Sequence, residues 1–528
     1  MPHKTESYTH DHYDNKFELM VVVMCSMAGT LMQALDTTIA NVALPYMQGS
    51  LSASREQITW VLTSYIVAAA IMTAPVGWVA SRFGKKNVIV ISVAGFTIAS
   101  MLCGMAQSLD EMVIFRLMQG VFGAALAPLS QSVMLDLYPP EKRGRMMAIW
   151  GMGIMVGPIL GPTLGGYLTD MYSWRWVFYV NVPFGIAASI GLWTFFKDNK
   201  QDSALKFDWS GFAILGVSVG ALQLLLDRGT TKDWFSSTEI LFYAVIAALG
   251  LYLFVVHMLT AKNTFIPKLL FKDRNLLSSL VLMFIVGAVL LASTALMPPV
   301  LQPLAGHTVT QTGLLLGPRG LGTVVAMIIV GRISNYVDPR ILMTIGAGTM
   351  ATTLYVMSGW TPSIGTVSLL TTTIIQGFGM GMVFVPLNLI AFATLPGTVR
   401  TDGTALMNLI RNIGSAVGIS VTTTVLSDSV QALHSQLTAY ATPFNRALGI
   451  NAPSMFYNLT LPFGAATFDG LIQLRAYTDA YENDFLFMFY ISLLAIPVIW
   501  LLRRPAYSHG LQQKPDVPAS AKAVEVLE

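Results

Sequence analysis

The chain has 528 residues, of which 54% are hydrophobic and only 11% are Asp, Glu, Lys or Arg, and its mean hydropathy is +0.61. A water-soluble protein carries about twice that share of charge, so the composition excludes a chain that is soluble throughout, and a net charge of +3 does not support nucleic-acid binding. Apolar runs of about 20 residues recur along the sequence, which predicts an all-α polytopic membrane protein.

Fourteen apolar segments are long enough to cross a membrane. We predict them at 18–45, 57–80, 87–106, 111–133, 146–168, 176–196, 210–226, 238–259, 275–299, 310–331, 341–360, 364–392, 404–426 and 484–502. Segments rich in basic residues tend to stay in the cytoplasm. Most of the 31 Lys and Arg lie in connecting segments on the same side of the predicted membrane as the N-terminus. We therefore expect a multi-pass membrane protein with cytoplasmic tails at 1–17 and 503–528.

The N-terminal tail holds His3, His10 and His12. Three histidines could bind a metal, but no cysteine or regularly spaced ligand set accompanies them, so we interpret the segment as a solvated tail. Cys25 and Cys103 lie in apolar runs and indicate neither a disulfide nor a metal site. No cofactor is expected.

The first span contains an acid, Asp36, within an apolar run. A charge there costs about 3 kcal/mol, so such a residue normally faces a cavity, pairs with a base or carries a proton. Gln33, Thr37 and Asn41 recur at four-residue intervals beside it and predict a polar lining of a central cavity. Hydrocarbon favours the neutral acid and an approaching cation favours the carboxylate, which makes Asp36 a candidate for proton coupling. The alternative is a permanently charged acid that joins helices through Arg116 in the fourth span, unless Arg116 only extends toward the membrane interface.

A short basic turn, 77–86, is predicted between the second and third spans, with Gly77, Arg82 and Gly84 as packing and gating candidates. The fifth span carries glycine at every fourth position, and proline follows two of these glycines. Small residues let another helix approach closely, and each proline removes a backbone hydrogen bond. We expect a seal and hinge, with plain packing as the alternative, built from Gly153, Gly157, Pro158, Gly161, Pro162 and Gly165.

Polar residues also interrupt the later spans. Asn388, Asn408, Arg411 and Asn412 are candidates for the substrate cavity, or they satisfy one another. The segment 427–483 is a long outer connection, which Pro443, Phe444 and Pro462 mark as irregular. It forms either a cap on the outer face or a docking surface for an adaptor.

An internal repeat relates the two ends of the chain. The turn 77–86 resembles 331–340, and Gln119-Gly120 resembles Gln376-Gly377, at nearly equal separations of about half the chain. Equal separations indicate one duplication.

The repeat predicts the domain organisation. We expect six-helix halves at 18–196 and 275–502, the second including 427–483, and two inserted transmembrane helices within 197–274. Substrate would bind between the halves near the membrane midplane.

Together these elements resemble the major facilitator superfamily, and within it the fourteen-span drug:proton antiporters of the EmrB type. The segment from Asp36 to Pro45 looks like the first-span motif, whose acid is implicated in proton coupling, and Arg116 with Gln119 resembles the fourth-span motif. The glycine and proline stripe is similar to the antiporter motif. The resemblance implies a major facilitator fold and proton-driven export of small lipophilic substrates through the lipid bilayer of a bacterial inner membrane. Ser81 departs from the family, which often has Asp there, and this weakens the usual charge relay of that turn.

The resemblance also implies partners, namely a periplasmic membrane-fusion adaptor (EmrA-like) and an outer-membrane channel (TolC-like). A proton-coupled importer of a small nutrient is the nearest alternative. A membrane-embedded enzyme is a different class, but the sequence has no P-loop, zinc signature or nucleophile elbow. The glycine and proline residues of the fifth span suit a transporter whose two halves move against each other, and they disfavour a channel with a fixed filter.

Overall fold

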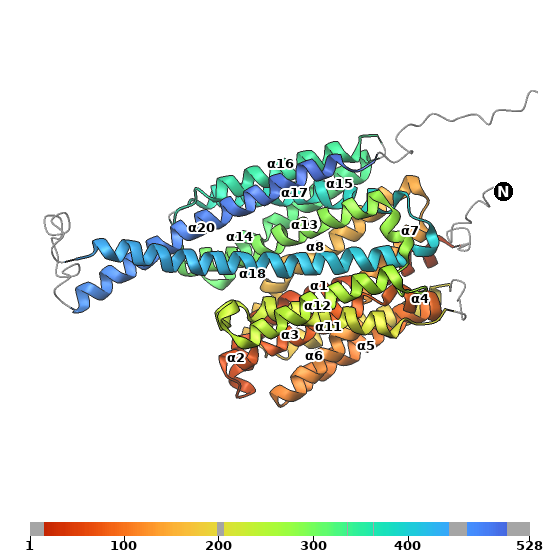
Figure 1. Ribbon diagram of the computed structural model, residues 1–528, viewed down its shortest axis with the longest axis horizontal. Helices are drawn as coiled ribbons and strands as arrows, with labels where there is room; N and C mark the ends of the chain where they lie inside the picture. Colours follow the sequence, from red (N-terminus) through yellow and green to blue (C-terminus); the bar gives the residue numbers. More distant parts are fainter. Residues whose placement is uncertain (1–14, 198–204, 335, 363, 443–461, 504–528) are drawn as a thin grey trace, which may run out of the picture.

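The long apolar segments fold as helices, because a helix satisfies its own backbone hydrogen bonds and so can cross lipid. The computed structural model describes residues 15–197, 205–334, 336–362, 364–442 and 462–503, and all regular elements within these ranges are helical. Most helices run along one long axis (Figure 1). The three tail histidines, the C-terminal tail beyond 503, and Pro443 and Phe444 lie outside the described residues.

Within the described residues, the first part of the chain contains ten α-helices, and the middle part contains two α-helices with the short helices η2 (Thr230–Lys232) and η3 (Trp234–Ser236) between them. They are α1 (Lys16–Ser50), α2 (Arg55–Ile58), α3 (Trp60–Thr73), α4 (Val76–Phe83), α5 (Lys85–Met105), α6 (Leu109–Gly123), α7 (Leu126–Leu137), α8 (Pro140–Met171), α9 (Trp176–Tyr179), α10 (Asn181–Phe195), α11 (Trp209–Arg228) and α12 (Thr238–Thr260).

The last part of the described chain follows the short helix η4 (Lys268–Lys272). It comprises α13 (Arg274–Pro299), η5 (Val300–Leu304), α14 (Val309–Leu316), α15 (Pro318–Ile333), α16 (Pro339–Met357), α17 (Thr366–Ala393), η6 (Gly397–Val399), α18 (Arg400–Tyr440) and α20 (Pro462–Trp500).

The structure confirms an all-α polytopic membrane protein. In the described part of the chain 11 helices are long and apolar enough to cross a membrane, and α3 with α4, bent by 58°, makes a twelfth. The two remaining predicted spans correspond to α8, which begins with charged residues and is rich in glycine, and to α16, which has 19 residues. The count of fourteen is compatible with these helices and stays a prediction.

Two helices are much longer than the spans predicted for them. α18 has 41 residues and α20 has 39, so each is about 60 Å long, twice the hydrocarbon thickness. Both project beyond the other helices (Figure 1), and the Nε2 atom of His434 lies 2.9 Å from Oδ1 of Asp469 between them. The described parts of the outer segment, 427–440 and 462–483, are therefore helical where we expected irregular structure, and Pro462 begins a helix, a position that suits proline.

The two ends of the chain pack in the same pattern. α1 packs on α8 as α13 packs on α18, and α3 packs on α6 as α15 packs on α17. Gly120 of α6 lies against the carbonyl oxygen of Tyr65 in α3, where an added Cβ would be 2.5 Å away, and Gly377 of α17 lies against the carbonyl of Arg319 in α15. The repeated Gln-Gly pairs thus share a packing role, which is close helix approach.

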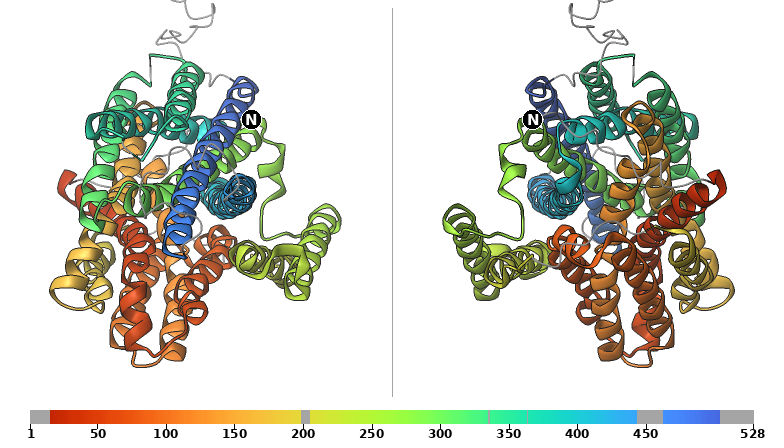
Figure 2. Two further views of the ribbon diagram at one scale, coloured as in Figure 1. Left: turned by 90° about the vertical axis from the view of Figure 1, so that its left-hand side faces the viewer. Right: turned by 90° about the vertical axis from the view of Figure 1, so that its right-hand side faces the viewer.

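The middle helices stand apart from this pattern. α11 and α12 pack against each other at the edge of the bundle (Figure 2), and α11 also contacts α3. The Oδ2 atom of Asp208, just before α11, lies 2.8 Å from Nε2 of His257 in α12. Helices α11 and α12 contact the rest of the bundle mainly through α3.

Candidate functional site

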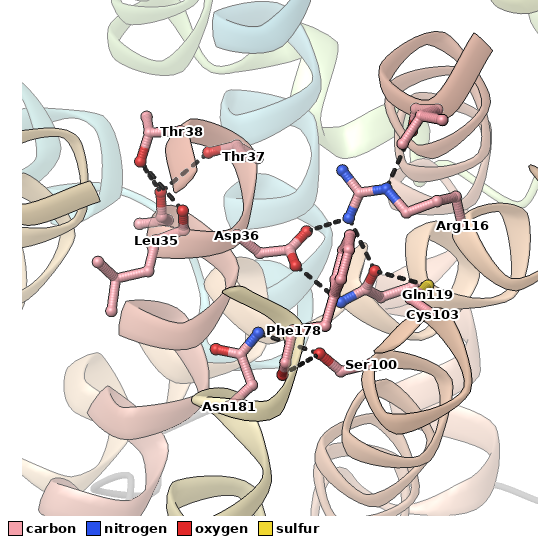
Figure 3. A network of polar contacts seen from close by, with 12 residues as sticks. Leu35, Asp36, Thr37, Thr38, Ser100, Cys103, Arg116, Gln119, Phe178 and Asn181 are labelled. Atoms are coloured by element: carbon pink, nitrogen blue, oxygen red, sulfur yellow. Dashed lines mark hydrogen bonds and ion pairs between the residues drawn. The ribbon is translucent and has the colours of Figure 1, made fainter. Parts of the chain in front are cut away.

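A buried ion pair joins the first and fourth predicted spans. The Nη1 atom of Arg116 in α6 lies 2.6 Å from Oδ2 of Asp36 in α1, and both side chains are 0% exposed. Gln119 completes the network, because its Nε2 donates to Oδ1 of Asp36 at 2.8 Å and its Oε1 accepts from Arg116 at 2.8 Å (Figure 3). Arg116 Nε donates to the carbonyl of Val61 at 2.9 Å. The predicted partnership of Asp36 and Arg116 is therefore present.

Aromatic rings cover the guanidinium of Arg116. Its Cζ lies 4.6 Å from the ring centre of Tyr65 and 5.4 Å from that of Phe178. The carbonyl of Phe178 accepts a hydrogen bond of 2.9 Å from Ser100, which fixes this part of the chain. Arg116 Nη2 is buried and has no hydrogen-bond partner. The site is thus sealed from solvent, with one unsatisfied guanidinium nitrogen.

The local sequence explains why the network forms. Arg116 and Gln119 are three residues apart on α6 and so share one helix face. Gly120 beside them permits the close contact with α3 described above. The carboxylate therefore meets two side chains from a single turn of one helix.

The predicted polar stripe on α1 takes no part in the network of Asp36. Asp36 points into the first part of the bundle, whereas Thr37 turns away from the network (Figure 3). Thr37 and Asn41 are exposed, and Thr37 Oγ1 donates to the carbonyl of Ala34. Gln33 Oε1 instead accepts from the backbone of Ala127 in α7 at 3.2 Å. These residues therefore face different neighbours.

The glycine stripe of α8 packs on α1. A Cβ at Gly157 would lie 2.6 Å from Ala34, and one at Gly161 would collide with Thr38 Oγ1. A Cβ at Gly153 would lie 3.1 Å from Met27, and a Cβ at Gly165 would lie 2.8 Å from Ile39. The stripe is thus a close-packing surface. α8 is helical through positions 158 and 162, so Pro158 and Pro162 lie within an unbroken helix, and a hinge at them stays a prediction.

Charged residues join the two parts of the bundle at the end where α4, α7 and the start of α18 meet (Figure 1). Asp136 of α7 forms ion pairs with Lys85 and, at 2.5 Å, with Arg400 of α18. Beside them Ser132 Oγ lies 2.7 Å from Thr401 Oγ1. We call Lys85, Ser132, Asp136, Arg400 and Thr401 the end junction. It links helices on both sides of the repeat.

The candidate gating residues of the turn lie next to the end junction. Gly77 of α4 is in contact with Asp402, which leaves no room for a Cβ. Gly84 separates α4 from α5 with φ +86°, a conformation that favours glycine. Arg82 has a buried Nη1 without a hydrogen-bond partner. Position 81 is a serine, and Asp136 supplies the carboxylate that bridges Lys85 to α18.

A narrow gap with no room for a water molecule lies between the two parts of the bundle. Three predicted cavity residues, Asn388, Asn408 and Arg411, line it, whereas Asn412 is not among the lining residues. The others are Gln131, Trp150, Met283, Phe384 and Met407. We call these eight residues the central cavity.

Amide side chains form a chain of hydrogen bonds across the central cavity. Gln131 Nε2 of α7 donates to Asn388 Oδ1 of α17 at 2.6 Å, and Asn408 Nδ2 of α18 donates to Gln131 Oε1 at 3.2 Å. Sequence reasoning missed Gln131 and Trp150. A signal was present for Gln131, which is a polar residue within an apolar segment, but none distinguished Trp150 from packing residues.

Sequence reasoning also did not predict that the residues of the end junction contact one another. Asp136, Lys85 and Arg400 each lie at the end of a predicted span, where a charge needs no explanation. No group of three or more His, Cys, Asp or Glu within the described ranges could hold a metal ion.

Comparison with known proteins gives consistent matches over most of the chain. The model of the Major Facilitator Superfamily matches residues 26–419. The multidrug export protein EmrB of Haemophilus influenzae is 37% identical over 429 residues, which is 81% of this chain and 84% of that protein. The fatty acid resistance protein FarB of Neisseria gonorrhoeae is 33% identical over 481 residues, 91% of this chain and 95% of that protein.

A solved structure shares the fold. The proton:xylose symporter XylE, bound to 6-bromo-6-deoxy-D-glucose, superposes with a TM-score of 0.58 over 92% of this chain and 96% of its own, at 14% sequence identity.

Proposed function

We propose, from the premise that this chain belongs to the Major Facilitator Superfamily, that it exports lipophilic compounds across a bacterial inner membrane in exchange for protons. The names of its relatives EmrB and FarB, a multidrug export protein and a fatty acid resistance protein, support export. A membrane potential supplies about 2.3 kcal/mol per charge per 100 mV, so a proton gradient is a sufficient energy source without a cofactor.

The proposed domains follow the repeated packing. Residues 18–196 and 275–502 are the two halves, 197–274 holds the inserted helices, and alternating access is a rocking of the halves about the central cavity. The end junction closes the halves at one end, and both described termini lie at that same end (Figure 1). With both termini in the cytoplasm, this arrangement is closed toward the cytoplasm.

The buried pair of Asp36 and Arg116 carries the proposal of proton coupling. With Asp36 ionised, its attraction to Arg116 holds α1 against α6 in a site that is 0% exposed. A proton on Asp36 removes the negative charge and leaves the buried guanidinium uncompensated, which is strongly unfavourable. The protonated protein therefore favours an arrangement in which Arg116 finds water or another partner. Proton binding and helix packing are coupled for this reason.

Exchange requires that cargo and proton stabilise different arrangements of the halves. Separation of the halves enlarges the central cavity for cargo and gives Asp36 access to water on one side at a time. Release of the proton restores the ion pair. Gly157, Gly161 and Gly165 let α1 and α8 move as one closely packed unit during this change.

The test uses inside-out membrane vesicles with an acidic lumen and fluorescent lipophilic compounds of positive, neutral and negative charge. Antiport predicts that a transported compound accumulates in the lumen while protons leave it. Asp36→Asn is expected to abolish both fluxes. The double variant Asp36→Asn with Arg116→Gln removes the charge imbalance and is expected to fold but not to couple.

The matched control is Asp208→Asn, which makes the same chemical change in a hydrogen-bonded carboxylate beside α11. It is expected to keep proton exchange. Coupled exchange that survives in the double variant removes Asp36 from the proposed role. Movement of the compound out of the lumen together with protons indicates an importer instead.

We extend the proposal to partners. The outer ends of α18 and α20 project beyond the bundle and offer a helical surface to a periplasmic membrane-fusion adaptor, EmrA-like, that leads to a TolC-like outer-membrane channel. Charge-reversed Asp469→Lys on this surface should weaken copurification of the adaptor, and Asp208→Lys at the opposite end should not. Equal copurification of both variants argues against this surface.

A further inference from the structure

The connection between the two inserted helices contacts both halves of the bundle. We call residues 226–239 the outer strap, which comprises the end of α11, η2, η3 and the start of α12. It lies near α2, at the end of the bundle opposite the end junction (Figure 1). We infer that the outer strap moves with the first half and holds the outer part of α18 until the halves rock. The inference rests on the proposed alternating access and names a device that regulates it.

Polar contacts attach the outer strap to α3 in the first half. Thr63 Oγ1 of α3 donates to Oδ2 of Asp227, and Cζ of Arg228 lies 5.6 Å from the ring centre of Trp60. Arg228 also forms an ion pair with Glu239 at the other end of the outer strap. These contacts fix one side of the outer strap to α3 and join its two ends to each other.

Close helix packing continues this attachment along α11. Gly216 and Gly220 of α11 face α3, where added Cβ atoms would lie 3.1 Å and 3.2 Å from Ile71. Glycines four residues apart let two helices approach closely along one face. Because α11 and α3 are in contact both along this face and at the outer strap, we expect them to move as one unit.

The attachment to α18 in the second half is smaller. Ser420 Oγ of α18 donates to the carbonyl of Leu226 at 2.8 Å, and Trp234 Nε1 donates to Thr424 Oγ1 at 3.0 Å. Ser420 and Thr424 are four residues apart and so share one face of α18. Two hydrogen bonds between neutral groups together change an equilibrium about tenfold or more. This side of the outer strap is therefore the one that releases when the halves move.

The backbone of the outer strap is strained at the residue that reaches α18. Asp233 and Trp234 have φ values of +53° and +48°, a left-handed conformation that is unfavourable for residues with bulky side chains. The Trp234 ring packs on Gly229, where an added Cβ would lie 2.8 Å from it. Strain of this kind persists only while surrounding contacts maintain it. Departure of Trp234 from Thr424 would let the turn relax, which favours release.

The first experiment locks the outer strap to α18. Trp234→Cys with Thr424→Cys is joined by a short, reducible bis-thiosulfonate linker in inside-out vesicles. Cys25→Ala removes the half-buried native thiol, whereas Cys103 is buried and can stay. Linked protein should lose transport of the fluorescent compounds and regain it when the linker is reduced. Normal transport by the linked protein overturns the inference.

The matched control locks the outer strap to α3 instead. Thr63→Cys with Asp227→Cys receives the same linker, and transport should continue because both positions belong to one moving unit. Reversible loss of transport in this pair as well would mean that the outer strap does not move with the first half, which also overturns the inference.

The second experiment needs neither a proton gradient nor a transported compound. Pulsed electron resonance measures distances between spin labels on the full chain in nanodiscs, from Thr238→Cys on the outer strap to Ser427→Cys on α18 or to Gly49→Cys at the end of α1; all three positions are exposed. Ser420→Ala with Trp234→Phe removes both donors. It should raise the population with a longer distance to α18 about tenfold and leave the distance to α1 unchanged.

The control for the spin labels is Thr423→Ala with Phe235→Leu. Thr423 Oγ1 donates within α18 to Ile419 at 2.8 Å, and Phe235 is exposed, so no distance should change. Unchanged distances in Ser420→Ala with Trp234→Phe overturn the inference. A held α18 in a protein without proton exchange refutes only the antiport, and proton exchange with an unrestrained α18 refutes only the outer strap.

Discussion

Removing one charge of the Asp36 and Arg116 pair is expected to destabilise the protein more than removing both. The variants are Asp36→Asn, Arg116→Gln and the two together. Each single variant leaves a buried charge without its counter-ion, whereas the double variant leaves two amides that can hydrogen-bond to each other. The prediction follows from the complete burial of both side chains and the 2.6 Å separation of their charged atoms.

The magnitude follows from what remains around each charge. In Asp36→Asn, Arg116 keeps the faces of Tyr65 and Phe178, which are worth about 2 kcal/mol for a desolvated cation. Breaking a buried pair costs about 3–5 kcal/mol, so the rings do not compensate. In Arg116→Gln, the carboxylate keeps only the hydrogen bond from Gln119. We expect a loss of about 3–5 kcal/mol for each single variant and clearly less than the sum for both.

The assay is equilibrium unfolding of the four proteins in mixed detergent micelles, followed by tryptophan fluorescence, which yields a double-mutant cycle. A loss of 3 kcal/mol is a change of more than a hundredfold in the unfolding equilibrium constant and is easily measured. Additive single effects, with a coupling free energy near zero, would refute the reasoning. That result would mean that water reaches the pair and screens it.

Three further predictions concern packing and the end junction. Gly161→Leu should lower Tm by several degrees, because its side chain collides with α1, while Gly166→Leu, where a Cβ meets nothing within 4 Å, should not. Gly84→Ala should cost about 1–2 kcal/mol in chemical denaturation, because φ is +86°. Ser132→Cys with Thr401→Cys should form a disulfide that stops transport until a reductant is added, because the two hydroxyl oxygens are 2.7 Å apart.

Each of these predictions has a clear contrary result. Equal Tm values for the two leucine variants would mean that α1 and α8 are not closely packed. Full stability of the alanine variant would mean that the turn does not require a positive φ. Normal transport by the oxidised, cross-linked protein would mean that the end junction need not open.

The sequence predicted the ion pair because both charges lie at similar depth in apolar helices, where an unpaired charge is costly. The polar stripe lies beside Asp36 and takes no part in its network for a geometric reason, and its place in a cavity stays a prediction. Gln33, Thr37 and Asn41 lie along one line of α1, but Asp36 is rotated by about 100° from Thr37 on the same helix. Adjacent positions on a helix face different neighbours, so Asp36 faces α6 while Thr37 and Asn41 are exposed.

Other features lay beyond sequence reasoning because they depend on contacts between distant segments. The central cavity unites Gln131 and Trp150 with residues more than a hundred positions later, and no spacing along the chain reveals that contact. The outer ends of α18 and α20 were missed for another reason. Hydropathy detects helices that lipid surrounds, whereas 427–440 and 462–483 are rich in polar residues and form helices outside that environment.

The length of α18 has a mechanical consequence. One unbroken helix carries Arg400 at its first residue, Arg411 three turns later and the projecting outer tip near Tyr440. A stiff rod that pivots near its middle swings its two tips in opposite directions. A force on the outer tip of α18 would therefore act on the ion pair of Arg400 about 60 Å away. A partner that binds the outer tip would in this way change how easily the opposite end opens, without contacting the transported compound.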